Sequence, residues 1–108
     1  MAAEGVIRVS SKAQHGIYVN AAKMQLQARP EIQLHGLGEA ITNTIRAADA
    51  LISLGYATLR KLETQTLTEP DEAGVARKRA KVVITLAKAA TFNQALEEFE
   101  KSRSQVKP

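Results

Sequence analysis

Two β-prone segments, residues 57–68 and 81–86, flank a highly charged turn. The turn sequence is EPDEAGVARKRAK, residues 69–81, in which Pro70 and Gly74 favour a reversal of the chain. Two such runs joined by a turn of this composition predict a long β-hairpin. Because a hairpin is only marginally stable alone, these residues require a sheet with an apolar face and something packed against it.

The return strand of this hairpin indicates which kind of sheet it joins. Its residues alternate in polarity, with one set forming an apolar face and the other a mixed face: Val82, Ile84 and Leu86, against Lys81, Val83, Thr85 and Ala87. This alternation is typical of a sheet that packs against helices on one side.

The rest of the chain supplies two further strands and three helices. Residues 6–9 and 31–35 read as short strands, and residues 13–28, 40–52 and 92–101 as helices. Two helical stripes are predicted to face the core: Tyr18, Ala21, Ala22, Gln25 and Ala28 in the first helix, and Ala40, Ile41, Thr44, Ile45, Ala48, Leu51 and Ile52 in the second. Gly55 stands where a left-handed cap would end the second helix.

This order of elements, β-α-β-α-β-β, predicts an α+β fold. We expect a two-layer sandwich with two helices on one face of a four-stranded mixed sheet, plus a short C-terminal helix. A chain of 108 residues suits one domain, here residues 6–101 between an N-terminal tail, 1–5, and a flexible C-terminal tail, 102–108.

The composition argues against most catalytic classes. The chain has no cysteine, two histidines, and no P-loop or metal-ligand spacing, so we expect neither an enzyme nor a cofactor or metal site. The absence of cysteine fits a reducing compartment, and we expect the cytoplasm, with the nucleus as a second location. No secretory signal is visible, and no apolar run approaches the ~18 residues of a membrane span.

The net charge of +4 is a moderate lean towards anionic partners. Arg77, Lys78 and Arg79 at the hairpin suit contact with a phosphate backbone, although charges there would also protect a sheet edge from aggregation, and the acidic residues before them could pair with them. Lys12 follows Ser10 and Ser11 in a short loop before the first helix. This loop is either a phosphate-binding site or carries an ordinary solvated lysine. The Gly36-x-Gly38 step reads as a tight turn against the second helix.

Four segments, in this order and spacing, resemble the Alba family: VIRVSSK at residues 6–12, IYVNAAK at 17–23, LHGLGEAI at 34–41 and AKVVITLAK at 80–88. The resemblance covers about residues 6–96. It implies a small basic dimer that binds double-stranded DNA in archaea and mainly RNA in many eukaryotes, often linked to translation or RNA processing. Leu37 and Glu39 stand where archaeal members favour arginines, so the resemblance favours RNA.

The resemblance also assigns residues. Lys12 occupies the family's lysine loop, Lys23 the lysine of its first helix, and residues 68–81 its mobile hairpin. The predicted nucleic-acid-binding residues are Lys12, Lys23, Arg77, Lys78, Arg79 and Lys81. The predicted partners are single-stranded or structured RNA, then double-stranded DNA, and a second copy of the chain or an Alba-like paralogue.

A second function stays open from the sequence. The chain could be an assembly subunit that binds nucleic acid only when paired with an Alba-like partner or a ribonucleoprotein. In that case the stripe around Ile41, Ile45 and Ile52 would partly form an interface.

Overall fold

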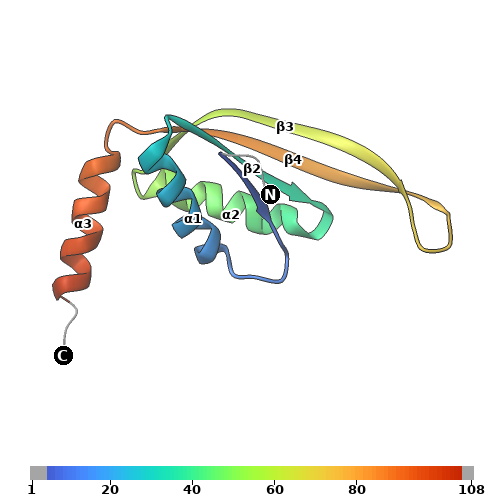
Figure 1. Ribbon diagram of the computed structural model, residues 1–108, viewed down its shortest axis with the longest axis horizontal. Helices are drawn as coiled ribbons and strands as arrows, with labels where there is room; N and C mark the ends of the chain where they lie inside the picture. The colour runs from blue at the N-terminus through green and yellow to red at the C-terminus, as the bar shows by residue number, and fades with distance from the viewer. Residues whose placement is uncertain (1–4, 106–108) are drawn as a thin grey trace.

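The computed structural model describes residues 5–105 and has the predicted order of elements (Figure 1). The strands are β1 (Val6–Val9), β2 (Glu31–Leu37), β3 (Ala57–Pro70) and β4 (Ala76–Lys88). The helices are α1 (His15–Ala28), α2 (Ile41–Ser53) and α3 (Phe92–Gln105), with the 3-10 turn η1 (Gly38–Ala40) before α2. The helix α3 extends past residue 101, where we expected it to end. Residues 1–4 and 106–108 of the expected tails lie outside the described part.

The four strands form one mixed sheet in the order β1-β2-β4-β3. The β1–β2 pair is parallel, and β4 is antiparallel to both of its neighbours. Helices α1 and α2 lie against one face of this sheet, while α3 stands at the end opposite the hairpin (Figure 1). The predicted α+β sandwich is therefore confirmed.

The core lies between the two helices and the sheet, and it differs from the predicted stripes in both helices. In α1 the buried residues are Val19, Ala22 and Leu26. Burying the aliphatic side chains of Val19 and Leu26 removes more apolar surface from water than burying the predicted Gln25 and Ala28 would. In α2 they are Thr44, Ala47, Ala48 and Leu51. The predicted Ile45 and Ile52 are instead 47% and 39% exposed. The apolar stripe of α2 is thus wider than the face that the sheet covers.

Two glycines set how α2 joins the sheet. A Cβ on Gly36 would collide with the Thr44 hydroxyl, so glycine lets the helix approach β2, as expected; Gly36 itself lies in the strand, however, and the predicted turn begins only at Gly38, with a φ of 58°. Gly55 has a φ of 87°, its N–H donates to the Ile52 carbonyl, and the Tyr56 N–H donates to Leu51. These bonds make the predicted left-handed cap a Schellman motif.

The hairpin is longer than predicted and leaves the sheet. The β2–β4 pairing ends at Leu37 and Lys81, whereas the β3–β4 pairing continues to Pro70 and Ala76. Residues 66–80 therefore form a two-stranded arm that projects from the body, and the molecule measures 54 Å along its longest axis (Figure 1). The turn spans only residues 71–75, so the cations that we expected in a loop lie on a strand.

The middle of β4 is buried on both faces. Val83 and Thr85 point away from the helices, yet only 7% and 8% of their surfaces are exposed. The polarity pattern predicted a covered face and an open face. The reason for the difference is that β4 lies inside the sheet, where longer side chains on both neighbouring strands flank these two residues on the outer face: His35 and Glu63 beside Val83, and Gln33 and Lys61 beside Thr85. Within residues 5–105, no helix is long and apolar enough to cross a membrane.

Candidate nucleic-acid interface

The strand geometry of β4 divides the hairpin cations between two faces. Alternation along the strand places Arg77, Arg79 and Lys81 on the outer face of the sheet, away from the helices, and Lys78 on the other. Arg77, Lys78 and Arg79 are exposed, whereas Lys81 is half-buried at the base of the arm. The arm therefore presents cations on both of its faces, which suits a flexible polyanion that can wrap around it.

Arg77 is engaged by the turn of its own hairpin. Its Nε lies 2.8 Å from Asp71 Oδ2, while Asp71 Oδ1 accepts the N–H groups of Ala73 and Val75, each at 2.9 Å. The Arg77 bond, and after it the Val75 bond, lowers the pKa of the Asp71 carboxyl below its usual 3.8. The ordering of the turn by the carboxylate is therefore present above pH 3.8 and is lost as the pH falls through the lowered pKa.

Replacing Asp71 with asparagine should strengthen RNA binding by about threefold and steepen its salt dependence by roughly one unit of slope. Asparagine keeps an Oδ1 that can accept the two turn N–H groups, but it removes the charge that neutralises Arg77. Fluorescence anisotropy over a salt series would measure both effects. The control is Glu72→Gln, which removes an equal charge that makes no described contact with Arg77. Equal gains in the two variants would show that net charge alone is responsible.

Arg79 folds back towards the body of the protein. A Cβ added to Gly38 would lie 3.0 Å from the Arg79 Nη2 atom, so the guanidinium lies against the backbone where η1 begins. Arg79 therefore joins the arm to the end of β2, and its charge is held close to the sheet.

The loop that carries Lys12 is fixed to both helices. The Asn43 amide of α2 donates to the carbonyls of Ser10 at 3.0 Å and Ala13 at 2.8 Å, and the Ser10 N–H donates to the Tyr18 hydroxyl of α1 at 2.9 Å. Lys12 is exposed, and its N–H donates to Ser10 Oγ at 3.1 Å. The lysine thus extends from a well-defined backbone.

Arg46 is a second cation at this loop that sequence reasoning did not select. It lines the same surface depression as Lys12, His15 and Asn43. Its position three residues after Asn43, outside the apolar stripe of α2, is the signal that could have identified it. The depression therefore carries two cations beside the start of α1.

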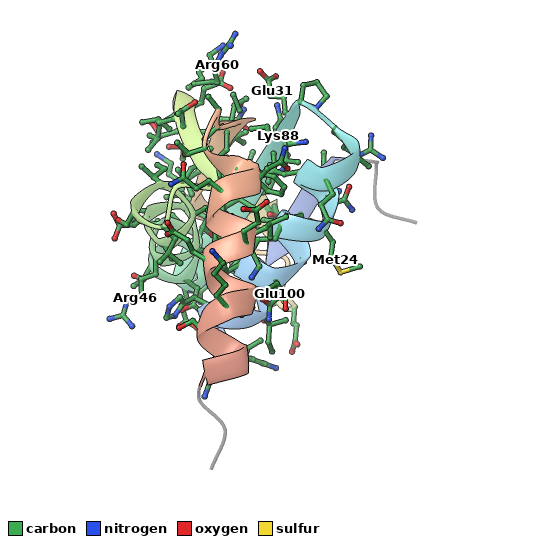
Figure 2. All side chains as sticks on the ribbon, turned by 90° about the vertical axis from the view of Figure 1, so that its left-hand side faces the viewer. Met24, Glu31, Arg46, Arg60, Lys88 and Glu100 are labelled. Carbon is green, nitrogen blue, oxygen red and sulfur yellow. The ribbon has the colours of Figure 1, made fainter. Side chains whose placement is uncertain are left out.

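Lys23 is separated from the other predicted binding residues. Its ammonium lies 3.9 Å from the centre of the Phe99 ring of α3 and 5.0 Å from that of Tyr56. This contact is at the α3 end of the molecule, which faces the viewer in Figure 2, whereas the arm projects from the other end. Cation–π contacts of this kind stabilise the packing of two elements. The geometry gives Lys23 a role in holding α3 against α1.

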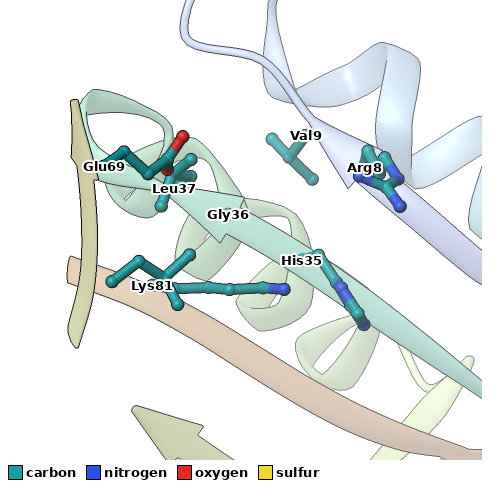
Figure 3. Close-up of a pocket in the computed structure, with 8 residues that line it drawn as sticks. Arg8, Val9, His35, Gly36, Leu37, Glu69 and Lys81 are labelled. Atoms are coloured by element: carbon teal, nitrogen blue, oxygen red, sulfur yellow. The ribbon is translucent and has the colours of Figure 1, made fainter. Parts of the chain in front are cut away.

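Lys81 belongs to a groove that the sequence did not predict. It lies with Arg8 of β1 and His35 of β2 on the outer face of the sheet (Figure 3). The pKa of His35 is lowered from 6.5 by burial first, then by the charges of Lys81 and Arg8. No group of three or more metal-ligating side chains occurs in the part of the chain that the structure describes.

Comparisons with known proteins agree with the observed fold. A model of the Alba family matches residues 5–69, which end before the hairpin cations. The chain is 34% identical over 94 residues to the uncharacterized protein At2g34160 of Arabidopsis thaliana, covering 82% of this chain and 72% of that protein. Its fold is similar to ALBA1 from Trypanosoma brucei, with a TM-score of 0.79, 21% identity and coverage of 97% and 87% of the two chains. It is also similar to Alba from Thermoplasma volcanium, with a TM-score of 0.69, 22% identity and coverage of 77% and 99%.

Proposed function

The chain belongs to the Alba family, whose members generally bind nucleic acids, and from this we propose that it binds RNA as a dimer. The hairpin arm and the Lys12 loop hold the phosphate backbone in this proposal. The role we propose is in RNA metabolism or translational control, in the cytoplasm and secondarily in the nucleus. Double-stranded DNA is the second ligand.

The observation that carries this proposal is the projecting arm. The β-ladder of residues 66–80 pairs only within the arm, so the exposed Lys78 can reach a ligand away from the body, while Arg79 adds a charge where the arm meets the sheet. Cations on such an arm contact phosphates without reading bases, so they supply affinity rather than sequence specificity.

Two features favour RNA over duplex DNA. Leu37 ends β2 and Glu39 lies in η1 before α2, at the positions where archaeal members of the family favour arginines. Glu69, Asp71 and Glu72 further reduce the field at the hairpin, which lowers non-specific attraction to a uniform duplex. Affinity then depends on a ligand that can follow both faces of the arm, as flexible RNA can.

An apolar surface at the β3 edge supports the dimer. Ile45 and Ile52 of α2 are exposed, and so are Leu59 and Leu62 of β3, at 52% and 51%. Leu59 and Leu62 pair with Leu86 and Ile84, so they point to the helix side, where α2 packs against β3. Exposed apolar side chains clustered in this way mark protein contacts. We call these four residues the β3-edge surface.

The β3-edge surface also favours one alternative function. If its partner is an Alba-like paralogue or a ribonucleoprotein, the chain acts as an assembly subunit and binds nucleic acid only within that complex. Adding a purified paralogue separates the two cases. Binding by the chain alone supports the first function, and binding that begins only with the paralogue supports the second.

The test of the proposed function is a salt titration of binding. Fluorescence anisotropy would compare single-stranded RNA, duplex RNA and duplex DNA of equal length at several salt concentrations. If a dimer neutralises about six phosphates, log K should fall with log salt at a slope of roughly −4 to −5. RNA should bind most tightly. Binding that does not respond to salt would contradict the phosphate mechanism.

A further inference from the structure

The outer face of the sheet carries a groove of about 340 Å³ at the base of the arm (Figure 3). It is open where β1 ends, at Val9, while β2 and the hairpin continue past it. The side chains on its walls come from all four strands: Arg8, His35, Leu37, Leu67, Glu69 and Lys81. This volume is at the lower end of the roughly 300–1,000 Å³ of small-molecule sites.

The strand register places these side chains on one face. Arg8 pairs with His35, and Leu37 pairs with Lys81, which pairs in turn with Gln65 of β3. Residues two apart on a strand point the same way, so Leu67 and Glu69 share the face of Gln65. This face is opposite to that of Leu34 and Ile84, which pack in the core. The groove is therefore separate from the helices and from the β3-edge surface.

The groove combines the groups that recognise a nucleotide. Arg8 and Lys81 supply positive charge for a phosphate, and Figure 3 shows the Lys81 side chain extending along the sheet towards His35. Leu37 and Leu67 are half-buried and give apolar walls. Glu69 is the only acid in the lining and can accept a hydrogen bond from an amino or imino group of a base.

His35 is held in place to act as a stacking platform. Its Nε2 lies 3.0 Å from Gln33 Oε1, a contact on the same face that fixes the ring. Burial first, and then the charges of Lys81 and Arg8, lower its pKa below 6.5 and so favour the neutral ring, which presents a flat aromatic face. The chain has only two Tyr, two Phe and no Trp. Tyr56 and Phe92 are buried in the core, Lys23 lies over the ring of Phe99, and the Tyr18 hydroxyl accepts the Ser10 N–H. His35 is thus a rare ring available to a base.

We propose that this groove binds one unpaired nucleotide of RNA, with its base against His35 and between Leu37 and Leu67, and its phosphate at Arg8 and Lys81. This inference rests on the proposed RNA-binding function and adds a preference for single-stranded regions. A base paired in a duplex cannot leave its stack to enter the groove without breaking its pairing, so duplexes gain nothing from it. In this arrangement the arm supplies most of the phosphate affinity, and the groove adds a preference for unpaired over paired RNA.

The test compares His35→Ala with wild type on unstructured single-stranded RNA and on a blunt RNA duplex. Loss of one stacked base should weaken single-stranded binding by about tenfold and leave duplex binding within about twofold. His35→Phe keeps an aromatic face and should restore most of the single-stranded affinity. Unchanged duplex binding by His35→Ala also shows that the variant is folded. Equal loss on both ligands would overturn the proposal.

Lys81→Ala tests the phosphate contact in the groove, and Lys61→Ala is its matched control. Lys61 is exposed on β3 and lies 3.4 Å from Glu63, outside the groove lining. Lys81→Ala should weaken single-stranded binding at least threefold more than Lys61→Ala does. NMR titration with the single-stranded RNA should shift the amides of Arg8, His35 and Lys81. Shifts confined to the arm would overturn the groove site.

The failure of this inference is distinguishable from failure of the proposed function. Salt-sensitive RNA binding that does not depend on His35 would leave the arm mechanism intact and remove the groove. Absence of RNA binding by the folded wild type would remove the proposed function itself, and the groove with it.

Discussion

A triple alanine variant at Arg77, Lys78 and Arg79 is expected to bind RNA roughly 30- to 100-fold more weakly than the wild type at moderate salt. The variant removes three charges from each arm, six in a dimer. It therefore neutralises fewer phosphates, and its binding releases fewer counterions from the RNA. The salt slope should become shallower for the same reason. Lys78 and Arg79 should account for most of the loss, because Asp71 already engages Arg77. Anisotropy over a salt series measures both quantities.

The control for this variant is an equal loss of charge elsewhere. Arg60, Lys61 and Lys101 are exposed on β3 and α3, outside the arm. Their triple alanine variant should lower the affinity only by the general effect of net charge, within about threefold. Circular dichroism should show both variants folded, because all six side chains are exposed. Equal weakening by the two triples would mean that the arm is not the binding element.

A double variant, Ile45→Glu with Leu62→Glu, is expected to raise the dissociation constant of the proposed dimer at least ~100-fold. The reason is that burying carboxylates in an apolar contact costs several kcal/mol. Both side chains are about half exposed in the single chain, so the fold should be retained. Sedimentation velocity over a concentration series would measure the dissociation. RNA affinity should fall as well, because two arms bound to one RNA add their contacts only when they are joined.

Ile17→Glu is the matched control, because Ile17 is 59% exposed on α1, away from the β3-edge surface. This variant should remain dimeric. A wild type that is monomeric at every concentration would contradict the homodimer. It would direct the same experiment to a mixture with an Alba-like paralogue, in which the double variant should again prevent assembly.

The element order was predictable because each signal is local. Strand alternation, the Arg29-Pro30 step and the glycine at position 55 depend on neighbours in the sequence, and the elements they indicate are all present, although β2 and β4 extend beyond the predicted bounds. The hairpin was predicted for the same reason, but its length was not. Polar strands carry no periodic apolar signal, so only the pairing of Thr66 with Ala80 and of Pro70 with Ala76 shows how far the arm extends.

The site depended on contacts between segments far apart in the chain. The charges of the hairpin were evident from the sequence, and so was the chance that acids before them would pair with them, but only the folded turn assigns Asp71 to Arg77. Lys23 matched a family lysine, yet the fold packs it against Phe99, 76 positions later in the sequence. Arg8 and His35 were not selected from their own segments, and Lys81 was selected only as a hairpin cation; the sheet register alone brings the three together.

The sequence by itself determined the class of fold, the order of its elements and the cationic hairpin, because periodicity and turn chemistry act over a few residues. The tertiary structure decided which face of each helix is buried, which cations are free to meet a ligand and where a groove opens on the sheet. Those outcomes depend on strand order and register, which bring distant residues together and which no local pattern encodes.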